Sequence, residues 1–284
     1  MVAQVPEPDR YAVFGNPIRH SRSPAIHSAF ARDTGERLDY QAVEAPLDGF
    51  AESVRSFMGG GGKGANITAP FKLEALTLAD EQRPNAAMAG AANCLKFENG
   101  RIIAENFDGI GLLNDIQTNL GYAVAGRNVL LLGAGGAARG ALLPFLGARP
   151  ARFAIANRNA DEACALQARS ASHGAIDASG LDDIEGGPFD LVVNATSASL
   201  FGELPAIPAH LFHAGTLAYD LVYGKGLTPF MQFARGSGAG RVADGAGMLV
   251  EQAAEAFAWW QGVRPETAHL IQELRASLPP IVES

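Results

Sequence analysis

An apolar segment followed at once by a glycine-rich turn and a helix constrains the fold more than any other part of the chain. Residues 128–132 have the pattern of a buried strand, and the turn then follows as Gly133-Ala134-Gly135-Gly136-Ala137-Ala138, which fits G-x-G-x-x-A. Glycines in this position let the backbone approach a pyrophosphate, and the amino end of the helix attracts its negative charge. The pattern predicts a dinucleotide site of the Rossmann type, although a turn that only packs helix against strand would look similar. The expected cofactor contacts here are Gly133, Ala134, Gly135, Gly136 and Ala137.

The end of the next strand bears on the choice of cofactor. An acid there usually binds the ribose 2′-hydroxyl of NAD, whereas a basic side chain admits the 2′-phosphate of NADP. Residues 153–156 read as this strand, and Asn157-Arg158 follows it. Arg158 favours NADP over NAD, although Glu162 adds negative charge nearby, which opposes a bound phosphate. The alternative interpretation is that Arg158 is a solvated surface arginine.

Strand and helix signals alternate along the chain, which is typical of an α/β fold with largely parallel sheets. In the first hundred residues we expect strands at 11–14, 40–43 and 65–68, and helices at 24–32, 47–58 and from Pro70 onward. A second alternation has strands at 128–132, 152–156, 190–194 and 217–223 and a helix at 137–146. Residues 248–261 form a long helix that is apolar on most sides, so we expect it to be buried.

Composition excludes several classes of protein. The chain of 284 residues carries a net charge of -8, which leaves no broad basic surface for nucleic acid. Its two cysteines, Cys94 and Cys164, have no paired or metal-like spacing, and the six histidines show no ligand pattern, so neither a disulfide framework nor a metal site is expected. The first ten residues lack the apolar stretch of a signal peptide, and the longest apolar segment contains Arg139 and Pro144, so we expect a cytoplasmic protein without a membrane span.

Small polar or acidic residues two positions apart recur in the first third of the chain. The pairs are Ser21 and Ser23, Asn66 and Thr68, and Asn106 and Asp108. In an extended chain alternate residues share a face, so each pair could line a cleft that binds a small polyol. Any single pair is also what turns and helix caps use.

Lys72 and a glycine run complete the candidates from the first domain. Lys72 falls in the first turn of the helix expected from Pro70, and a lysine next to a carboxylate such as Asp108 can transfer a proton, although a solvated lysine is the alternative. The run from Gly59 to Gly64 is not a phosphate loop, because Gly64 follows Gly-Lys where serine or threonine is required. We interpret that run as a flexible connector.

These segments, in this order and at these intervals, resemble motifs of the shikimate dehydrogenase family over nearly the whole chain. Residues 15–24 (GNPIRHSRSP) resemble G-x-P-x-x-H-S-x-S-P, and residues 66–72 (NITAPFK) resemble N-[VI]-T-x-P-[FH]-K. Residues 90–93 (GAAN) are similar to G-A-x-N, and residues 105–109 (ENFDG) resemble the N-T-D-x-x-G segment. Further along, N-R-T is matched by residues 157–158, and the loop beside the cofactor by residues 194–196. The motif Y-D-x-x-Y is matched by residues 219–223, and the segment that carries the family's substrate glutamine by residues 247–252.

The resemblance implies a role for each matched residue. It makes Lys72 and Asp108 catalytic, and it assigns substrate binding to Ser21, Ser23, Asn66, Thr68, Asn93, Tyr223 and Gln252. It adds Asn157, Arg158, Thr196, Leu221 and Gly245 to the cofactor contacts. The chain departs from the family pattern at Phe107, where threonine is common, at Asn159, which replaces the threonine of N-R-T, and at Glu162, where many relatives carry a second arginine.

The resemblance also implies an activity and a domain plan. The expected reaction is the reversible, NADP-dependent reduction of 3-dehydroshikimate to shikimate in chorismate and aromatic amino-acid biosynthesis, by a monomer or homodimer. We expect a substrate-binding catalytic domain over residues 1–107, joined again by residues 245–284, and an NADP-binding Rossmann domain over residues 108–244. An NAD-dependent quinate/shikimate dehydrogenase and a dinucleotide-binding regulatory protein without turnover are the alternatives.

Overall fold

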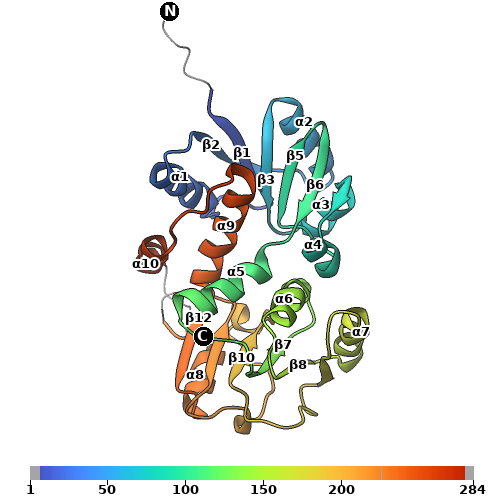
Figure 1. The fold of residues 1–284 in the computed structure, drawn as a ribbon, viewed down its shortest axis with the longest axis vertical. Coiled ribbons are helices and arrows are strands. Elements are labelled where there is room, and N and C mark those ends of the chain that lie inside the picture. Colours follow the sequence, from blue (N-terminus) through green and yellow to red (C-terminus); the bar gives the residue numbers. More distant parts are fainter. Residues whose placement is uncertain (1–6, 225, 279–284) are drawn as a thin grey trace, which may run out of the picture. The chain divides into compact units, whose positions relative to one another are not determined.

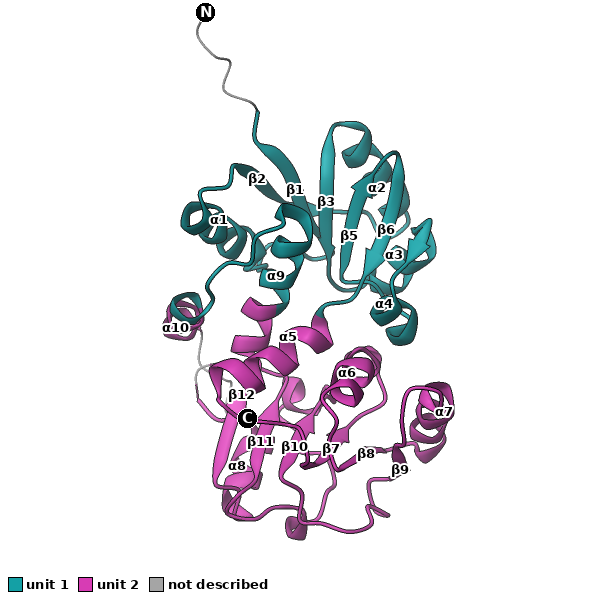
Figure 2. Ribbon diagram, viewed as in Figure 1, with its two compact units in different colours: residues 1–107, 252–270 teal, residues 108–251, 271–284 magenta. Residues whose placement is uncertain are grey.

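The computed structural model describes residues 7–224 and 226–278, which form two compact units. Figure 1 labels their elements and Figure 2 colours the units. Unit 1 consists of the described residues up to Phe107 together with Gln252–Leu270, and unit 2 of Asp108–Glu251 together with the described residues from Ile271 onward. Helix α9, Ala246–Gln261, contributes to both units, so the segment that rejoins unit 1 is shorter than residues 245–284.

The sheet of unit 1 is mixed. Its strands are β1 (Asp9–Gly15), β2 (Leu38–Glu44), β3 (Gly62–Ile67), β4 (Glu81–Gln82), β5 (Cys94–Glu98) and β6 (Arg101–Glu105), in the order β2-β1-β3-β5-β6-β4. Strands β2, β1 and β3 are parallel, but β5 is antiparallel to both β3 and β6. The expectation of a largely parallel sheet is therefore wrong for the β5–β6 hairpin. Its turn is Asn99-Gly100, and both residues have the positive φ, 53° and 75°, that a tight hairpin turn requires.

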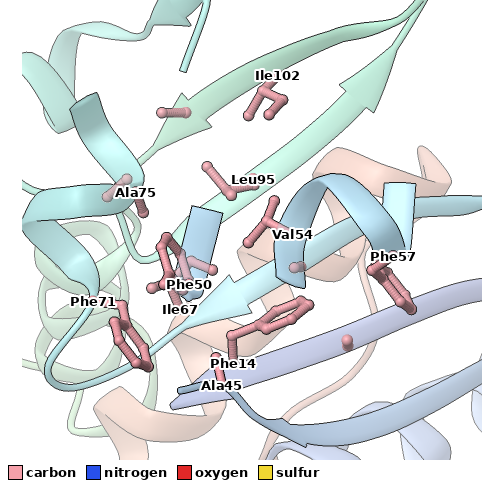
Figure 3. Close-up of a cluster of buried hydrophobic side chains, with 14 of the residues drawn as sticks. Phe14, Ala45, Phe50, Val54, Phe57, Ile67, Phe71, Ala75, Leu95 and Ile102 are labelled. Atoms are coloured by element: carbon pink, nitrogen blue, oxygen red, sulfur yellow. The ribbon is translucent and has the colours of Figure 1, made fainter. Parts of the chain in front are cut away.

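Helices α2 and α3 cover one face of this sheet. The helices of unit 1 are α1 (Ser23–Thr34), α2 (Phe50–Gly59), α3 (Lys72–Leu78) and α4 (Pro84–Ala89). Figure 3 shows the buried cluster, in which Phe14 and Leu95 of the sheet lie beneath the two helices. Phe50 stacks on Phe71 with ring centroids 4.6 Å apart, and this contact holds α2 against the start of α3. The helix expected from Pro70 onward starts two residues later, at Lys72, and Pro70 lies in the turn before it.

The glycine run is more constrained than a flexible connector. Strand β3 begins at Gly62, so half of the run belongs to the sheet. A side chain on Gly62 would overlap the ring of Phe57, and a Cβ on Gly64 would lie 2.5 Å from Nε1 of Trp260. Close packing, and not flexibility, therefore requires glycine at these two positions.

Unit 2 has a fully parallel sheet of six strands. They are β7 (Asn128–Leu132), β8 (Arg152–Asn157), β9 (Asp177–Gly180), β10 (Leu191–Asn194), β11 (Leu217–Asp220) and β12 (Arg241–Asp244), in the order β12-β11-β10-β7-β8-β9. Numbered along the chain from β7, this is the order 3-2-1-4-5-6 of a dinucleotide-binding sheet. The Rossmann prediction is confirmed.

Helix α5 (Asp108–Asn114) precedes the first strand of unit 2, and the other helices of this unit come after individual strands. These are α6 (Gly136–Gly147), α7 (Ala160–Ser170), α8 (Pro229–Gly236) and α9, while α10 (Ala268–Ser277) ends in this unit. A π-helical turn at Asp115–Asn119 extends α5, and short 3-10 helices lie at Ala198–Phe201 and Ala209–Leu211. Among the residues that the structure describes, none of the helices has the length and apolar character needed to span a membrane.

Candidate active site

A cavity of about 950 Å³ lies within unit 2, where strands β7, β8 and β10 end. Strands β7 and β10 are adjacent in the sheet, and the chain order reverses between them. Ligands of open α/β sheets bind at such a switch point, outside the carboxyl ends of the strands. The lining includes these residues expected to contact the cofactor: Gly133, Ala134, Gly135, Gly136, Ala137, Asn157, Arg158 and Thr196.

The glycine turn has the geometry that a pyrophosphate needs. Gly133 has φ of 109°, and a Cβ there would lie 3.1 Å from the carbonyl oxygen of Ala195. At Gly135, which lines the cavity, a Cβ would meet no atom within 4 Å and would project into open space. Helix α6 starts at the next residue without a side-chain cap, so its first N–H groups are left for an anion. These residues fit a bound dinucleotide.

Asn157 and Arg158 follow β8 at one side of the cavity. The side-chain amide of Asn157 donates to Oε2 of Glu162 at 2.8 Å and to the carbonyl oxygen of Asn159 at 3.0 Å. The carbonyl oxygen of the Asn157 side chain is thereby left as a hydrogen-bond acceptor. Arg158 is exposed and lines the cavity, so its guanidinium is the positive group on this side.

A buried carboxylate holds the loop on the opposite side of the cavity. Oδ2 of Asp220 accepts hydrogen bonds from Ser199 at 2.7 Å and Thr228 at 2.6 Å, while Oδ1 accepts from Asn194 at 3.2 Å. Oδ1 of Asn194 in turn accepts from the hydroxyl of Thr196 at 2.7 Å. Burial raises the pKa of Asp220 above its usual value, and these hydrogen bonds oppose the rise. Asp220 therefore fixes Thr196 through Asn194.

Three of the residues expected to bind substrate form a hydrogen-bonded cluster inside unit 1. Asn93 donates through Nδ2 to Oε1 of Gln252 at 3.3 Å, and Asn66 donates through Nδ2 to the carbonyl oxygen of Asn93 at 3.5 Å. The backbone N–H of Phe107 donates to Oδ1 of Asn93 at 2.9 Å. Asn66 lies near the end of β3, Asn93 precedes β5 and Gln252 lies on α9, so the fold joins residues that are far apart in the sequence.

The other candidates in unit 1 lie between the end of a strand and the first turn of the next helix. Ser23 begins α1, and its backbone N–H donates to the hydroxyl oxygen of Ser21 at 3.3 Å. Thr68 follows the end of β3, and its N–H donates to the carbonyl oxygen of Phe14 at 2.9 Å. Lys72 is half-buried at the start of α3, and its carbonyl oxygen accepts from the N–H of Ala92 at 2.8 Å.

The extended geometry expected for the three polar pairs is wrong in part. In each pair the second residue lies outside a strand. Thr68 follows β3, which ends at Ile67, while Ser23 begins α1 and Asp108 begins α5. Phe107 is 7% exposed and packs edge-on against Trp259 with centroids 5.6 Å apart, so it points into the core as expected.

The remaining candidates belong to unit 2. Asp108 is half-buried, and Gly109 after it packs so tightly on α6 that a Cβ would overlap the carbonyl oxygen of Gly140. A Cβ on Gly245 would likewise overlap the carbonyl oxygen of Leu221, so these two lie together, but outside the lining of the large cavity. Tyr223 is 38% exposed and also lies outside that lining.

Some lining residues of the cavity were not anticipated from the sequence. Leu181, Asp182 and Asp183 follow β9, and Phe201 and Leu204 come from the segment around the 3-10 helix after β10. Strand β9 has the sequence DASG, which carries no strand pattern. Phe201 is 73% exposed in the folded chain, and its local sequence did not point to the cavity.

A Rossmann sheet with a phosphate-binding turn, carried on the same chain as a second α/β unit that clusters amide side chains, defines a dinucleotide-dependent dehydrogenase. Two family models match the chain: the shikimate dehydrogenase substrate binding domain over residues 13–95, and the shikimate 5′-dehydrogenase C-terminal domain over residues 245–275. The chain belongs to the shikimate dehydrogenase family and is an oxidoreductase.

Relatives and solved structures agree with this assignment. The chain is 55% identical over 273 residues to a shikimate dehydrogenase (NADP(+)) of Aromatoleum aromaticum, covering 95% of this chain and 98% of the relative. It is similar to an Ael1 enzyme from Pseudomonas putida, with 57% identity, a TM-score of 0.91 and coverage of 94% and 98%. It is also similar to shikimate 5-dehydrogenase from Thermus thermophilus in complex with NADP(H) and shikimate, with 31% identity, a TM-score of 0.82 and coverage of 95% and 100%. Family and fold are confirmed, and the relatives' cofactor agrees with the prediction of NADP.

Proposed function

We propose that this chain catalyses the reversible, NADP-dependent reduction of 3-dehydroshikimate to shikimate, a step of chorismate and aromatic amino-acid biosynthesis. The observation that carries the proposal is the cluster of Asn66, Asn93 and Gln252 in unit 1, because three amides joined by hydrogen bonds suit a small ligand with several hydroxyls. The cavity of unit 2 supports the cofactor half of the reaction.

NADPH, when bound, supplies the hydride. The turn at Gly133–Gly136 and the amino end of α6 would hold its pyrophosphate, and Arg158 its 2′-phosphate. Thr196, held in place through Asn194, would contact the cofactor from the opposite side. The protein thus orients the cofactor and neutralises its charge.

The substrate roles rest on the family resemblance together with the local geometry. Asn66, Thr68, Asn93 and Gln252 would bind the ring hydroxyls, and the substrate carboxylate would be bound by Ser21, Ser23 and Tyr223. Lys72, at the start of α3, would donate a proton to the oxygen of the C3 carbonyl as it is reduced, with Asp108 as its carboxylate partner. In the reverse direction the same pair removes the proton from the C3 hydroxyl.

Absorbance of NADPH at 340 nm tests the proposal directly. The purified chain should form NADPH from shikimate and NADP⁺, and rates with shikimate or quinate and with NADP⁺ or NAD⁺ should rank shikimate with NADP⁺ first. A preference for quinate or NAD⁺ would favour the quinate/shikimate dehydrogenase alternative. Binding of dinucleotide without turnover on either substrate would favour the regulatory protein.

Lys72→Ala tests the proton-transfer role. We expect kcat to fall by about 100-fold, the usual effect of losing a general acid, with KM for shikimate changed by less than about threefold. Lys63→Ala is the matched control, because Lys63 is an exposed lysine on β3 in the same unit. Near-normal kcat in Lys72→Ala would contradict the role.

We extend the proposal to the setting of the enzyme. Both cysteines are free thiols, Cys94 buried and Cys164 exposed, which suits a reducing cytoplasm. The net charge of -8 leaves no broad basic surface for nucleic acid, so the expected partners are shikimate and 3-dehydroshikimate, and the enzyme would work as a monomer or homodimer.

A further inference from the structure

The phenol of Tyr40 joins two of the residues proposed to bind substrate. Tyr40 lies on β2, is 8% exposed and donates its O–H to Oδ1 of Asn66 on β3, across a distance of 2.7 Å. The side chain of Ser23, the first residue of α1, also hydrogen-bonds the same phenol. Burial raises the pKa of Tyr40 well above its usual value, so the phenol keeps its proton and remains a donor.

This contact fixes which way the carboxamide of Asn66 faces. With Oδ1 on the Tyr40 side, Nδ2 points toward the carbonyl oxygen of Asn93, 3.5 Å away. A carboxamide turned by 180° would set its oxygen against that carbonyl oxygen and would leave the phenol proton facing an N–H group. The side chain of His27 also interacts with that of Asn66. Because an amide nitrogen carries two hydrogens, Nδ2 can donate to an acceptor on a ligand as well as to the carbonyl oxygen of Asn93.

The ring of Tyr40 is held by its neighbours. His27 of α1 is fully buried and stacks on Tyr40 with ring centroids 4.3 Å apart and planes 7° apart. Trp260 and Phe257 of α9 lie against His27 at 5.4 Å and 6.2 Å. Burial lowers the pKa of His27 to about 3, so the imidazole is a neutral, flat ring at physiological pH. The phenol oxygen therefore has one position available to it.

We propose that Tyr40 is a positioning residue for substrate binding. By donating to Oδ1 of Asn66 it holds the carboxamide in one orientation, in which Nδ2 can donate a hydrogen bond to a substrate oxygen. The inference deepens the proposed function and rests on it. It adds a specificity rule, since the substrate must offer a lone pair, as a hydroxyl or carbonyl oxygen does, at the position that meets Asn66. A group that can only donate is rejected there.

Tyr40→Phe tests this role, because phenylalanine keeps the ring and its stacking on His27 but removes the hydroxyl. We expect KM for shikimate to rise about 5- to 10-fold, the usual effect of losing one ordered hydrogen bond, with kcat within about twofold and KM for NADP⁺ unchanged. Tyr11→Phe is the matched control. Tyr11 pairs with Tyr40 in the sheet, and its phenol oxygen accepts from Gln261 at 3.0 Å, away from the proposed substrate residues. Its loss should leave all three constants unchanged.

A double-mutant cycle separates positioning from general distortion. If Tyr40 acts through Asn66, adding Tyr40→Phe to Asn66→Ala should raise KM no further than Asn66→Ala alone. An unchanged KM in the single variant Tyr40→Phe overturns the inference, and so does an equal rise in both backgrounds.

A spectroscopic readout keeps the inference testable without turnover. The side-chain ¹⁵N–¹H₂ signals of Asn66, identified by their loss in Asn66→Ala, should shift in Tyr40→Phe and stay in place in Tyr11→Phe. Signals that do not move in Tyr40→Phe would overturn the role of Tyr40. Wild-type protein that fails to oxidise shikimate would instead refute the proposed function, while the NMR comparison would still decide whether Tyr40 orients Asn66.

Discussion

Replacing His27 should change how the stability of unit 1 depends on pH. By distance and angle neither ring nitrogen of His27 makes a well-formed hydrogen bond. Burial lowers the pKa of His27 to about 3 from 6.5, and this effect outweighs the opposing interaction with the side chain of Asn66. Between these values the unfolded chain binds a proton that the folded chain excludes, so folding stability falls as the pH drops below 6.5. The loss approaches about 1.4 kcal/mol per pH unit and amounts to about 2.3 kcal/mol between pH 6.5 and 4.5, because the unfolded imidazole is already half protonated at pH 6.5.

His27→Phe removes this linkage while keeping an aromatic ring in the cage of Tyr40, Phe30 and Trp260. At pH 7.5 we expect the variant to be within about 1 kcal/mol of the wild type or more stable, because no buried ring nitrogen is left without a partner. As the pH falls below 6.5, the variant should become progressively more stable than the wild type.

Urea unfolding from pH 7.5 to 4.5, followed by tryptophan fluorescence, provides the measurement. Both tryptophans of the chain, Trp259 and Trp260, lie in unit 1, so the signal reports on the unit that contains His27. His173→Gln serves as the control, because an exposed ring in unit 2 is hydrated in the folded and unfolded chain alike. Parallel curves of unfolding free energy against pH for wild type and His27→Phe would refute the reasoning.

Three further predictions concern unit 2. Gly109→Ala should cost about 1–3 kcal/mol in urea unfolding followed by circular dichroism, because the added methyl overlaps the carbonyl oxygen of Gly140, and a shift below about 0.5 kcal/mol would show that α5 can move aside. Asp220→Ala should cost about 3–5 kcal/mol in the same assay, since it leaves buried donors such as Asn194 without their acceptor, whereas Asp220→Asn should cost less than half as much. Arg158→Ala should raise KM for NADP⁺ about tenfold and leave KM for NAD⁺ within about twofold, and equal effects on both cofactors would remove Arg158 from the phosphate site.

The dinucleotide site was the part of the molecule most open to prediction from sequence. The glycine turn at Gly133–Gly136, the strand before it and the helix after it are contiguous, so local pattern alone defines them. Residues 181–183 escaped notice because β9 owes its extended form to pairing with β8, and pairing partners do not appear in a local pattern.

The substrate side could not be built from spacing. Asn66, Asn93 and Gln252 come from three separate segments, and only the folded chain joins them by hydrogen bonds, so the family resemblance was needed to single them out. The β5–β6 hairpin did carry a readable signal, since Asn99-Gly100 is the sequence that two-residue hairpin turns favour. Expecting strict alternation of strand and helix obscured it.

The two contributions of α9 have a consequence for how the chain matures on the ribosome. His27 and Tyr40 are synthesised early, but Phe257 and Trp260, which complete their aromatic cage, emerge only after residues 108–251. At about 5–20 residues per second, that delay is roughly 7–30 s. At the end of this delay residues 108–251 have been synthesised, whereas the face of the first sheet that carries Tyr40 is covered by α1 alone and still lacks α9. Unit 1 is therefore begun first along the chain but can be completed only after residues 108–251 have been made.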